Sequence, residues 1–178
     1  MNGFEILRKY YPESSALRQL LLTHSCQVAK KALRIAWKHP ELNLNTDFLL
    51  EAAMVHDIGI YLTDASGIYC TGSYPYLLHG YLGAKLMRME GREDLARVCE
   101  RHTGTGLYDE DIRRQQLPLP PGIYHPVTLE EQVVCYADKF FSKSHPERER
   151  TIEQTARSLE KWGEECVIRF NQWAAKFE

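Results

Sequence analysis

The chain has 178 residues, with 22 lysines and arginines against 24 aspartates and glutamates, which gives a formal net charge of −2. This near-neutral charge argues against a nucleic-acid partner, because proteins that bind nucleic acids carry a basic surface. Hydrophobic residues make up 44% of the chain, which excludes a disordered protein, and the length fits one domain over residues 1–178.

Helical periodicity dominates the first part of the chain. Residues 14–38 place apolar side chains three and four positions apart, which predicts one long amphipathic helix. Residues 46–58 predict a second helix, with Thr46 as its N-cap and Gly59 just past its end. Residues 59–78 contain glycines, a proline and four tyrosines, and we expect a loop there, whose tyrosines either pack on the core or stack on a nucleobase.

More helices are predicted in the rest of the chain. Residues 79–90 and 92–102 each have the length and pattern of a short helix. Residues 107–127 are rich in proline and predict a long ordered loop. Residues 128–141 open with a capping box and predict another helix, and a last helix is expected over about 147–176. Because no segment alternates with a period of two, the sequence predicts an all-α fold.

Six potential metal ligands fall on these predicted helices. A lone histidine on an apolar face is more often a core residue whose hydrogen bonds are satisfied. Six potential ligands from five predicted helices instead favour a metal centre. An ionised carboxylate in an apolar interior costs several kcal/mol unless it is paired or binds a metal, and imidazole with carboxylate suits Zn, Fe, Mn, Co or Ni. The candidate ligands are His24, His56, Asp57, His79, His102 and Asp138.

The order of these residues resembles the HD-domain superfamily of metal-dependent phosphohydrolases. Residues 56–59 read His-Asp-Ile-Gly, which is similar to the HDIG subgroup. The segments HGYLGAKLM at 79–87, ERHTGTGL at 100–107 and PVTLEEQVVCYADKFFS at 126–142 also resemble that subgroup. The resemblance covers about residues 20–145, and it implies a helical bundle with a metal site between its core helices.

The resemblance also implies how the ligands are used. His79 and His102 would hold a second ion that Asp57 bridges to the first, or they would lie against substrate phosphates beside one dominant ion, as in related diadenosine tetraphosphate hydrolases. Both arrangements remain open, and so does the identity of the metal among Fe, Mn, Co, Ni and Zn. The implied ligands of the first ion are His24, His56, Asp57 and Asp138.

One position departs from the HDIG pattern. Many HDIG phosphodiesterases have a phosphate-contacting lysine directly after the glycine, where this chain has Ile60. Either Arg101, Lys139 or Lys143 replaces that cation, or the substrate differs. Lys139 follows Asp138 on a helix and is expected to point away from the site. The Gly-Tyr-Pro motif of cyclic-dinucleotide phosphodiesterases is absent. The candidate catalytic residues are Asp57, Arg101 and Lys143, and the candidate substrate contacts are Arg101, Thr103 and Lys143.

The predicted function is a metal-dependent phosphohydrolase that uses metal-activated water on a nucleotide or a related phosphate ester or anhydride. Two alternatives stay open: a di-iron oxygenase of the HD-domain type and a non-catalytic nucleotide-binding module. The expected partner is a small phosphate compound. No apolar run approaches the roughly 18 residues of a transmembrane helix, and five single cysteines without a secretory signal predict a cytoplasmic protein. The oligomeric state is left open.

Overall fold

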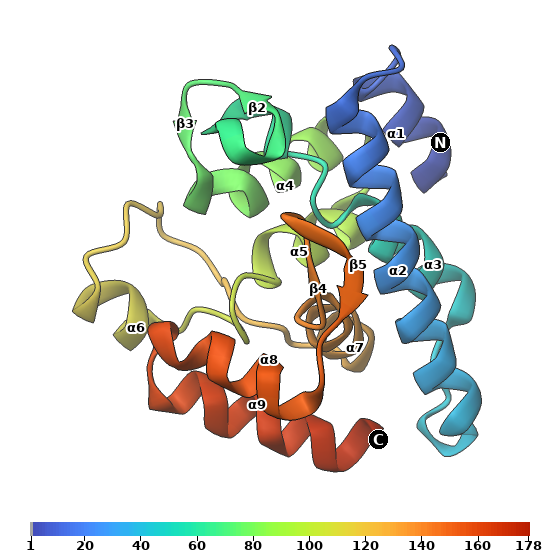
Figure 1. Cartoon of the computed structure of the whole chain (residues 1–178), viewed down its shortest axis with the longest axis vertical. Helices are drawn as coiled ribbons and strands as arrows, with labels where there is room; N and C mark the ends of the chain where they lie inside the picture. Colours follow the sequence, from blue (N-terminus) through green and yellow to red (C-terminus); the bar gives the residue numbers. More distant parts are fainter. Residues whose placement is uncertain (1) are drawn as a thin grey trace.

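A computed structural model describes residues 2–178, and its architecture is helical with two small sheets (Figure 1). The all-α prediction is confirmed. None of the helices within the described residues is long and apolar enough to cross a membrane. The α-helices are α1 (Gly3–Tyr10), α2 (Ala16–Lys38), α3 (Thr46–Val55), α4 (His79–Met89), α5 (Glu93–Arg101), α6 (Asp109–Arg114), α7 (Leu129–Asp138), α8 (Ile152–Leu159) and α9 (Glu164–Phe177).

Helix α2 is the long helix predicted for residues 14–38. It begins after Ser15, whose side chain accepts a hydrogen bond from the backbone N–H of Arg18. Its buried face lies against α3 and α7. The cap of α3 differs from the prediction, because Asn45 rather than Thr46 accepts the backbone N–H of Phe48. Helix α1 was not predicted; it packs against α3.

The tyrosine-rich segment 59–78 is more ordered than the predicted loop. It contains short 3-10 turns and a three-stranded sheet in the order β2-β1-β3, formed by Thr63–Ala65 (β1), Cys70–Thr71 (β2) and Tyr74–Pro75 (β3). Strands of two or three residues are too short for an alternating pattern, so period-two patterning does not reveal them. The predicted loop 107–127 likewise contains the short helix α6.

The prediction of one last helix over 147–176 is wrong. The chain first forms the antiparallel pair β4 (Phe141–Ser142) and β5 (His145–Glu149), and then two helices, α8 and α9. Gly163 separates these helices with φ 107° and ψ 162°, a conformation open almost only to glycine. The chain therefore turns back, and α9 packs against α8 and α7.

These elements surround the point where the candidate ligands meet. Helix α7 contacts α2, α3 and α5, and α4 lies against α5. In Figure 1, α2 and α3 stand on one side of α5 and α7, while α8 and α9 lie below them. The β4–β5 pair lies in front of α7, next to the centre of the molecule (Figure 1).

Candidate metal centre

All six predicted ligands come together in the interior. They form two overlapping groups, and Asp57 belongs to both. The exposed fraction of each residue is 8% or less. Most of them stand at helix ends: His79 begins α4, Asp138 ends α7, and His102 follows α5 directly. Helix α3 ends at Val55, so His56 and Asp57 lie in the turn after it rather than inside the predicted helix 46–58.

The first group joins α2, the turn after α3, and the end of α7. His24 Nε2 lies 2.9 Å from Asp138 Oδ1 and 3.2 Å from Asp57 Oδ2. His56 Nε2 lies 3.0 Å from the same Asp57 oxygen and 3.3 Å from His24 Nε2. Two ring nitrogens and two carboxylates therefore point at one position, which is a ligand set suited to a first-row divalent metal.

The second group uses the other oxygen of the same carboxylate. His79 Nε2 and His102 Nε2 each lie 3.4 Å from Asp57 Oδ1. These two ring nitrogens are 3.0 Å apart. Asp57 thus directs Oδ2 to one histidine pair and Oδ1 to the other, so it could serve as a ligand in both groups.

Backbone carbonyls fix the orientation of three of these rings. The Nδ1 atoms of His56, His79 and His102 lie 2.7–2.8 Å from the carbonyl oxygens of the residues three positions earlier, Ala53, Tyr76 and Cys99. A carbonyl oxygen only accepts, so each Nδ1 carries the proton and donates it. In the neutral ring Nε2 is then an unprotonated acceptor, as in metal-bound histidines.

This tautomer leaves the centre without enough donors of its own. The facing Nε2 atoms of His79 and His102 are both lone pairs in the neutral form, so neither can donate to the other across 3.0 Å. Asp57 Oδ1 receives no well-formed hydrogen bond from the described residues, and Oδ2 faces the Lys143 ammonium as an ion pair. A divalent cation would satisfy these acceptors together, because each would become a ligand. The residues present therefore fit a metal.

The titration behaviour of the histidines supports this fit. Burial lowers the pKa of His79 to about 3, which keeps the ring neutral with its lone pair available. Burial also acts to lower the pKa of His56, but the adjacent carboxylates of Asp57 and Asp138 outweigh it and raise that pKa to about 9. The position between these carboxylates thus strongly favours positive charge.

Two lysines reach the centre. Lys143 lies in the turn between β4 and β5, and its Nζ is 2.5 Å from Asp57 Oδ2. The expectation that Lys139 points away is wrong. Its Nζ lies 2.5 Å from Asp138 Oδ2 and donates to the His102 carbonyl at 2.7 Å. Because α7 ends at Asp138, the helical spacing that placed Lys139 on another face does not extend to it.

Arg101 is held elsewhere. Its guanidinium Nη1 donates to both carboxylate oxygens of Glu131, at 3.0 and 3.1 Å, and both side chains are nearly buried. The structure therefore ties Arg101 to helix α7 and does not bring it into the pocket beside the ligands. Thr103 and Gly104 do line that pocket, in the turn that follows His102.

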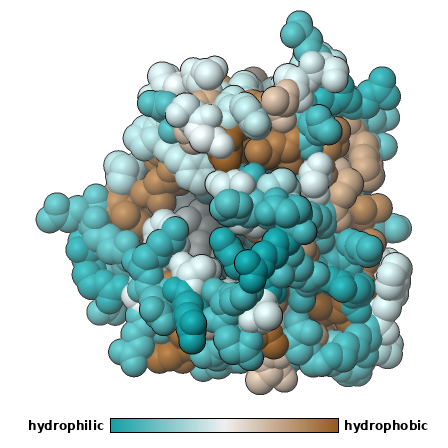
Figure 2. All heavy atoms as spheres, in the orientation of Figure 1, coloured by the Kyte–Doolittle hydropathy of each residue, from teal (hydrophilic) through white to brown (hydrophobic). Residues whose placement is uncertain are grey.

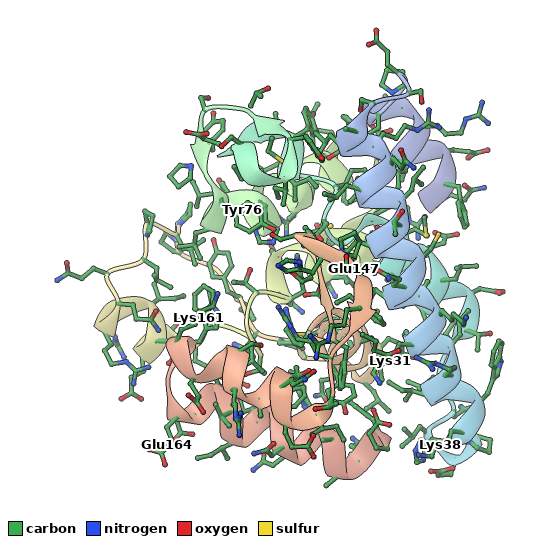
Figure 3. The ribbon with its side chains drawn as sticks, viewed as in Figure 1. Lys31, Lys38, Tyr76, Glu147, Lys161 and Glu164 are labelled. Carbon is green, nitrogen blue, oxygen red and sulfur yellow. The ribbon has the colours of Figure 1, made fainter. Side chains whose placement is uncertain are left out.

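The pocket next to the metal centre has a volume of about 460 Å³, within the range of small-ligand sites. His79, His102 and Asp138 lie at its floor, and a hollow is visible near the centre of the largely hydrophilic face in Figure 2. Tyr76 lines it from the segment before α4, and Lys161 lines it from the 3-10 turn after α8 (Figure 3). Tyr76 stacks on His79, with ring centroids 4.7 Å apart.

Sequence reasoning missed part of this lining. Arg150, Lys161 and Trp162 lie near the C-terminal end, far from the histidine pattern, and nothing in their spacing connects them to it.

The other three histidines of the chain lie outside the metal centre. His39 contacts Glu41, His125 stacks on Tyr108, and His145 is exposed on β5. Each of these three histidines is followed by a proline.

Gly59 places the two histidine groups at the right separation. A Cβ atom at this position would lie 2.2 Å from the carbonyl oxygen of His79 and 2.4 Å from the backbone nitrogen of Gly83. Only a residue without a side chain lets α4 approach the turn that carries His56 and Asp57 so closely.

We expect Gly59→Ala to push α4 away from that turn. The variant should lose about 1–3 kcal/mol of unfolding free energy, as overpacked interiors do, and it should bind metal more weakly because His79 moves with α4. Urea unfolding and metal analysis by mass spectrometry measure these two effects. Gly67→Ala is the matched control, since a Cβ there meets nothing within 4 Å. Unchanged stability and metal content in Gly59→Ala would contradict this role.

Comparison with known proteins identifies related sequences. The model of the HD domain family matches residues 21–142. The chain is 33% identical over 123 residues to a tRNA (cytidine(56)-2′-O)-methyltransferase of Thermoplasma volcanium, and the match covers 68% of this chain and 32% of that protein. A methyltransferase of the same name from Picrophilus torridus is 32% identical over 124 residues, covering 69% of this chain and 32% of the relative.

A third relative is an uncharacterized protein of Methanocaldococcus jannaschii, 32% identical over 121 residues, which are 66% of this chain and 64% of that protein. The matched region thus spans about a third of each methyltransferase and somewhat under two thirds of the third relative. No solved structure gives a significant match.

Proposed function

Since the chain belongs to the HD domain family, we propose that it is a metal-dependent phosphohydrolase that acts on a nucleotide or a related phosphate ester or anhydride. The observation that carries this proposal is the position of Asp57, whose two oxygens face two separate histidine pairs at the floor of one pocket. A divalent metal held there would lower the pKa of a coordinated water toward 7 and stabilise charge on phosphoryl oxygens.

The chain's own residues supply the remaining parts of such a site. The Lys143 ammonium stands at Asp57 and lines the pocket, where it is placed to contact a phosphate oxygen. Lys143 thereby supplies the positive charge that many HDIG phosphodiesterases have at the position of Ile60. In this chain Ile60 is apolar and fully buried in the core. Thr103 and the Gly104 backbone, which has φ 59°, form the adjoining pocket wall, where a hydroxyl and an N–H orient the same group.

Lys139 has a positioning role in this proposal. Its ammonium joins the Asp138 carboxylate, a ligand of the first group, to the His102 carbonyl in the second. It therefore holds the end of α7 against the turn after α5. Because the Lys139 ammonium is held by both the Asp138 carboxylate and the His102 carbonyl, its proposed role is to position these residues rather than to bind phosphate.

The names of two relatives refer to methyl transfer to tRNA. The matched region is about a third of each of those proteins, and we propose that it carries a metal centre of the HD type there rather than the methyl transfer. The small net charge of −2 also favours a small phosphate compound over tRNA as the ligand of this chain.

The test is metal reconstitution. Protein stripped by a chelator and reloaded separately with Mn, Fe, Co, Ni or Zn is incubated with nucleoside monophosphates, dinucleoside polyphosphates and cyclic nucleotides. We expect phosphate or nucleotide release that requires metal and is supported by more than one of these ions. Oxygen consumption with iron alone would instead establish the oxygenase, and ligand binding without turnover under every metal would establish the binding module.

A further inference from the structure

The outer wall of the pocket comes from a part of the chain that follows the HD family region. That region ends at residue 142, and the wall is formed by Arg150, Ser158, Leu159, Lys161 and Trp162. Arg150 lies between β5 and α8, Ser158 and Leu159 end α8, and the other two belong to the 3-10 helix Glu160–Trp162. The pocket therefore has a floor built by the metal ligands and a wall that the family pattern does not specify.

The cations that line the pocket differ in whether a carboxylate pairs with them. Near the floor, Lys139 and Lys143 are each paired with a ligand carboxylate. In the wall, Arg150 and Lys161 make no ion pair with any carboxylate of residues 2–178. Arg150 Nη1 has one long contact, 3.4 Å, to the Lys139 carbonyl, and Lys161 Nζ lies 5.7 Å from the centroid of the Trp162 ring.

Unpaired cations in a partly enclosed pocket create a local positive field, even though the whole chain is slightly negative. The lining residues include four cations and only one carboxylate, Asp138. A guanidinium presents a planar set of donors that matches phosphate oxygens, and Arg150 has most of its donors uncommitted. Trp162, Leu159 and Ile68 add an apolar surface beside these cations, which suits the ring of a nucleoside.

We propose that Arg150 and Lys161 form a subsite for a second phosphate group, so that the pocket takes a nucleotide bearing two phosphates, one at the metal centre and one at the wall. This inference rests on the proposed function, because that function places the first phosphate of the ligand at the metal centre and so directs the second toward the wall. The second phosphate is joined either through an anhydride, as in a nucleoside diphosphate, or as a separate ester, as in a nucleoside bisphosphate.

The test compares three ligands on the manganese-loaded full-length protein: adenosine 5′-monophosphate, adenosine 5′-diphosphate and adenosine 3′,5′-bisphosphate. Binding is measured by isothermal titration calorimetry, and chromatography of the recovered ligand identifies any turnover. We expect at least one diphosphorylated ligand to bind roughly tenfold more tightly than the monophosphate, the size of one charge-assisted hydrogen bond. Whether the diphosphate or the bisphosphate is preferred identifies the linkage.

Variants of the wall residues test whether they cause the tighter binding of the diphosphorylated ligand. Arg150→Gln and Lys161→Gln should each reduce the preference for the diphosphorylated ligand, while affinity for the monophosphate stays the same. Arg148→Gln and Lys176→Gln are matched controls, because both residues are exposed and neither lines this pocket. If Arg150→Gln does not fold, Lys161→Gln decides, since Lys161 is exposed and outside the core.

Two results would overturn the subsite: diphosphorylated ligands that bind no more tightly than the monophosphate, or variants that retain the full preference. Failure of the proposed function has a different signature. If the preference is present and is lost in both variants, but no ligand is turned over with any metal, the subsite stands and the hydrolase does not. If the monophosphate is hydrolysed without any preference, the hydrolase stands and the subsite does not.

Discussion

Asp57→Asn is expected to abolish both metal binding and phosphohydrolase activity. The carboxylate is fully buried, and Asp57 is the residue that the two ligand groups among the described residues share. An asparagine of the same shape has one oxygen and no charge, so it cannot serve both groups. Activity should fall on the order of a thousandfold, because several kcal/mol of metal-based transition-state stabilisation are lost.

The measurement pairs activity with metal content, determined by mass spectrometry on purified protein. Asp64→Asn is the matched control, since Asp64 is exposed on β1 close by in the sequence and takes no part in the centre. It should keep both metal and activity. Circular dichroism shows whether the Asp57 variant is folded. A folded Asp57→Asn protein with full metal content and full activity would refute the proposed centre.

Glu131→Gln is expected to have the largest effect on stability. The exposed fraction of Glu131 is 4% and that of Arg101 is 9%. Glu131 accepts hydrogen bonds from the Arg101 guanidinium and from the backbone N–H groups of Val127 and Thr128, which directly precede α7. The amide would leave the Arg101 charge buried without a counter-charge, at a cost of about 3–5 kcal/mol. The corresponding fall in Tm is on the order of 10 °C.

Two further variants show that the cause is the unpaired charge. In the double variant Arg101→Leu with Glu131→Leu no charge is left behind, so it should be more stable than Glu131→Gln. Glu93→Gln breaks ion pairs of α5 whose partners are 40–49% exposed, and it should change the unfolding free energy by no more than about 1 kcal/mol. Equal urea midpoints for Glu131→Gln and the wild-type chain would show that the buried pair contributes nothing.

Much of the metal centre can be predicted from the sequence alone. The six candidate ligands could be selected from the sequence because their chemistry is unusual for an interior and their order matches a known pattern. His24 illustrates this, since it lies on the apolar stripe of α2 that the three- and four-residue spacing reveals. The helices that carry the ligands were predicted nearly in full, except at their ends.

The ends of helices depend on contacts that are remote in the sequence. Helix α7 stops at Asp138 and not at residue 141, and this shorter end brings Lys139 into the site. Arg101 shows the opposite error. Its position beside His102 suggested a substrate contact, but the buried Glu131, thirty residues away, binds it. Ion-pair partners of this kind are set by packing and not by local pattern.

The C-terminal wall of the pocket could not be predicted for a similar reason. Arg150 and Lys161 look like ordinary solvated charges of a helix. They reach the pocket because the β4–β5 pair reverses the chain after α7, and α8 then follows directly. Strands this short leave no alternating pattern in the sequence, so the reversal could not be predicted.

The three histidines whose Nδ1 atoms donate to backbone carbonyls have a consequence for how the centre tolerates mutation. Many metal sites orient their histidines with a second carboxylate, which one codon change removes. Here the acceptors are the carbonyl oxygens of Ala53, Tyr76 and Cys99, and every amino acid has that oxygen. Sequence drift at these three positions can alter packing, but it cannot delete the groups that aim the rings.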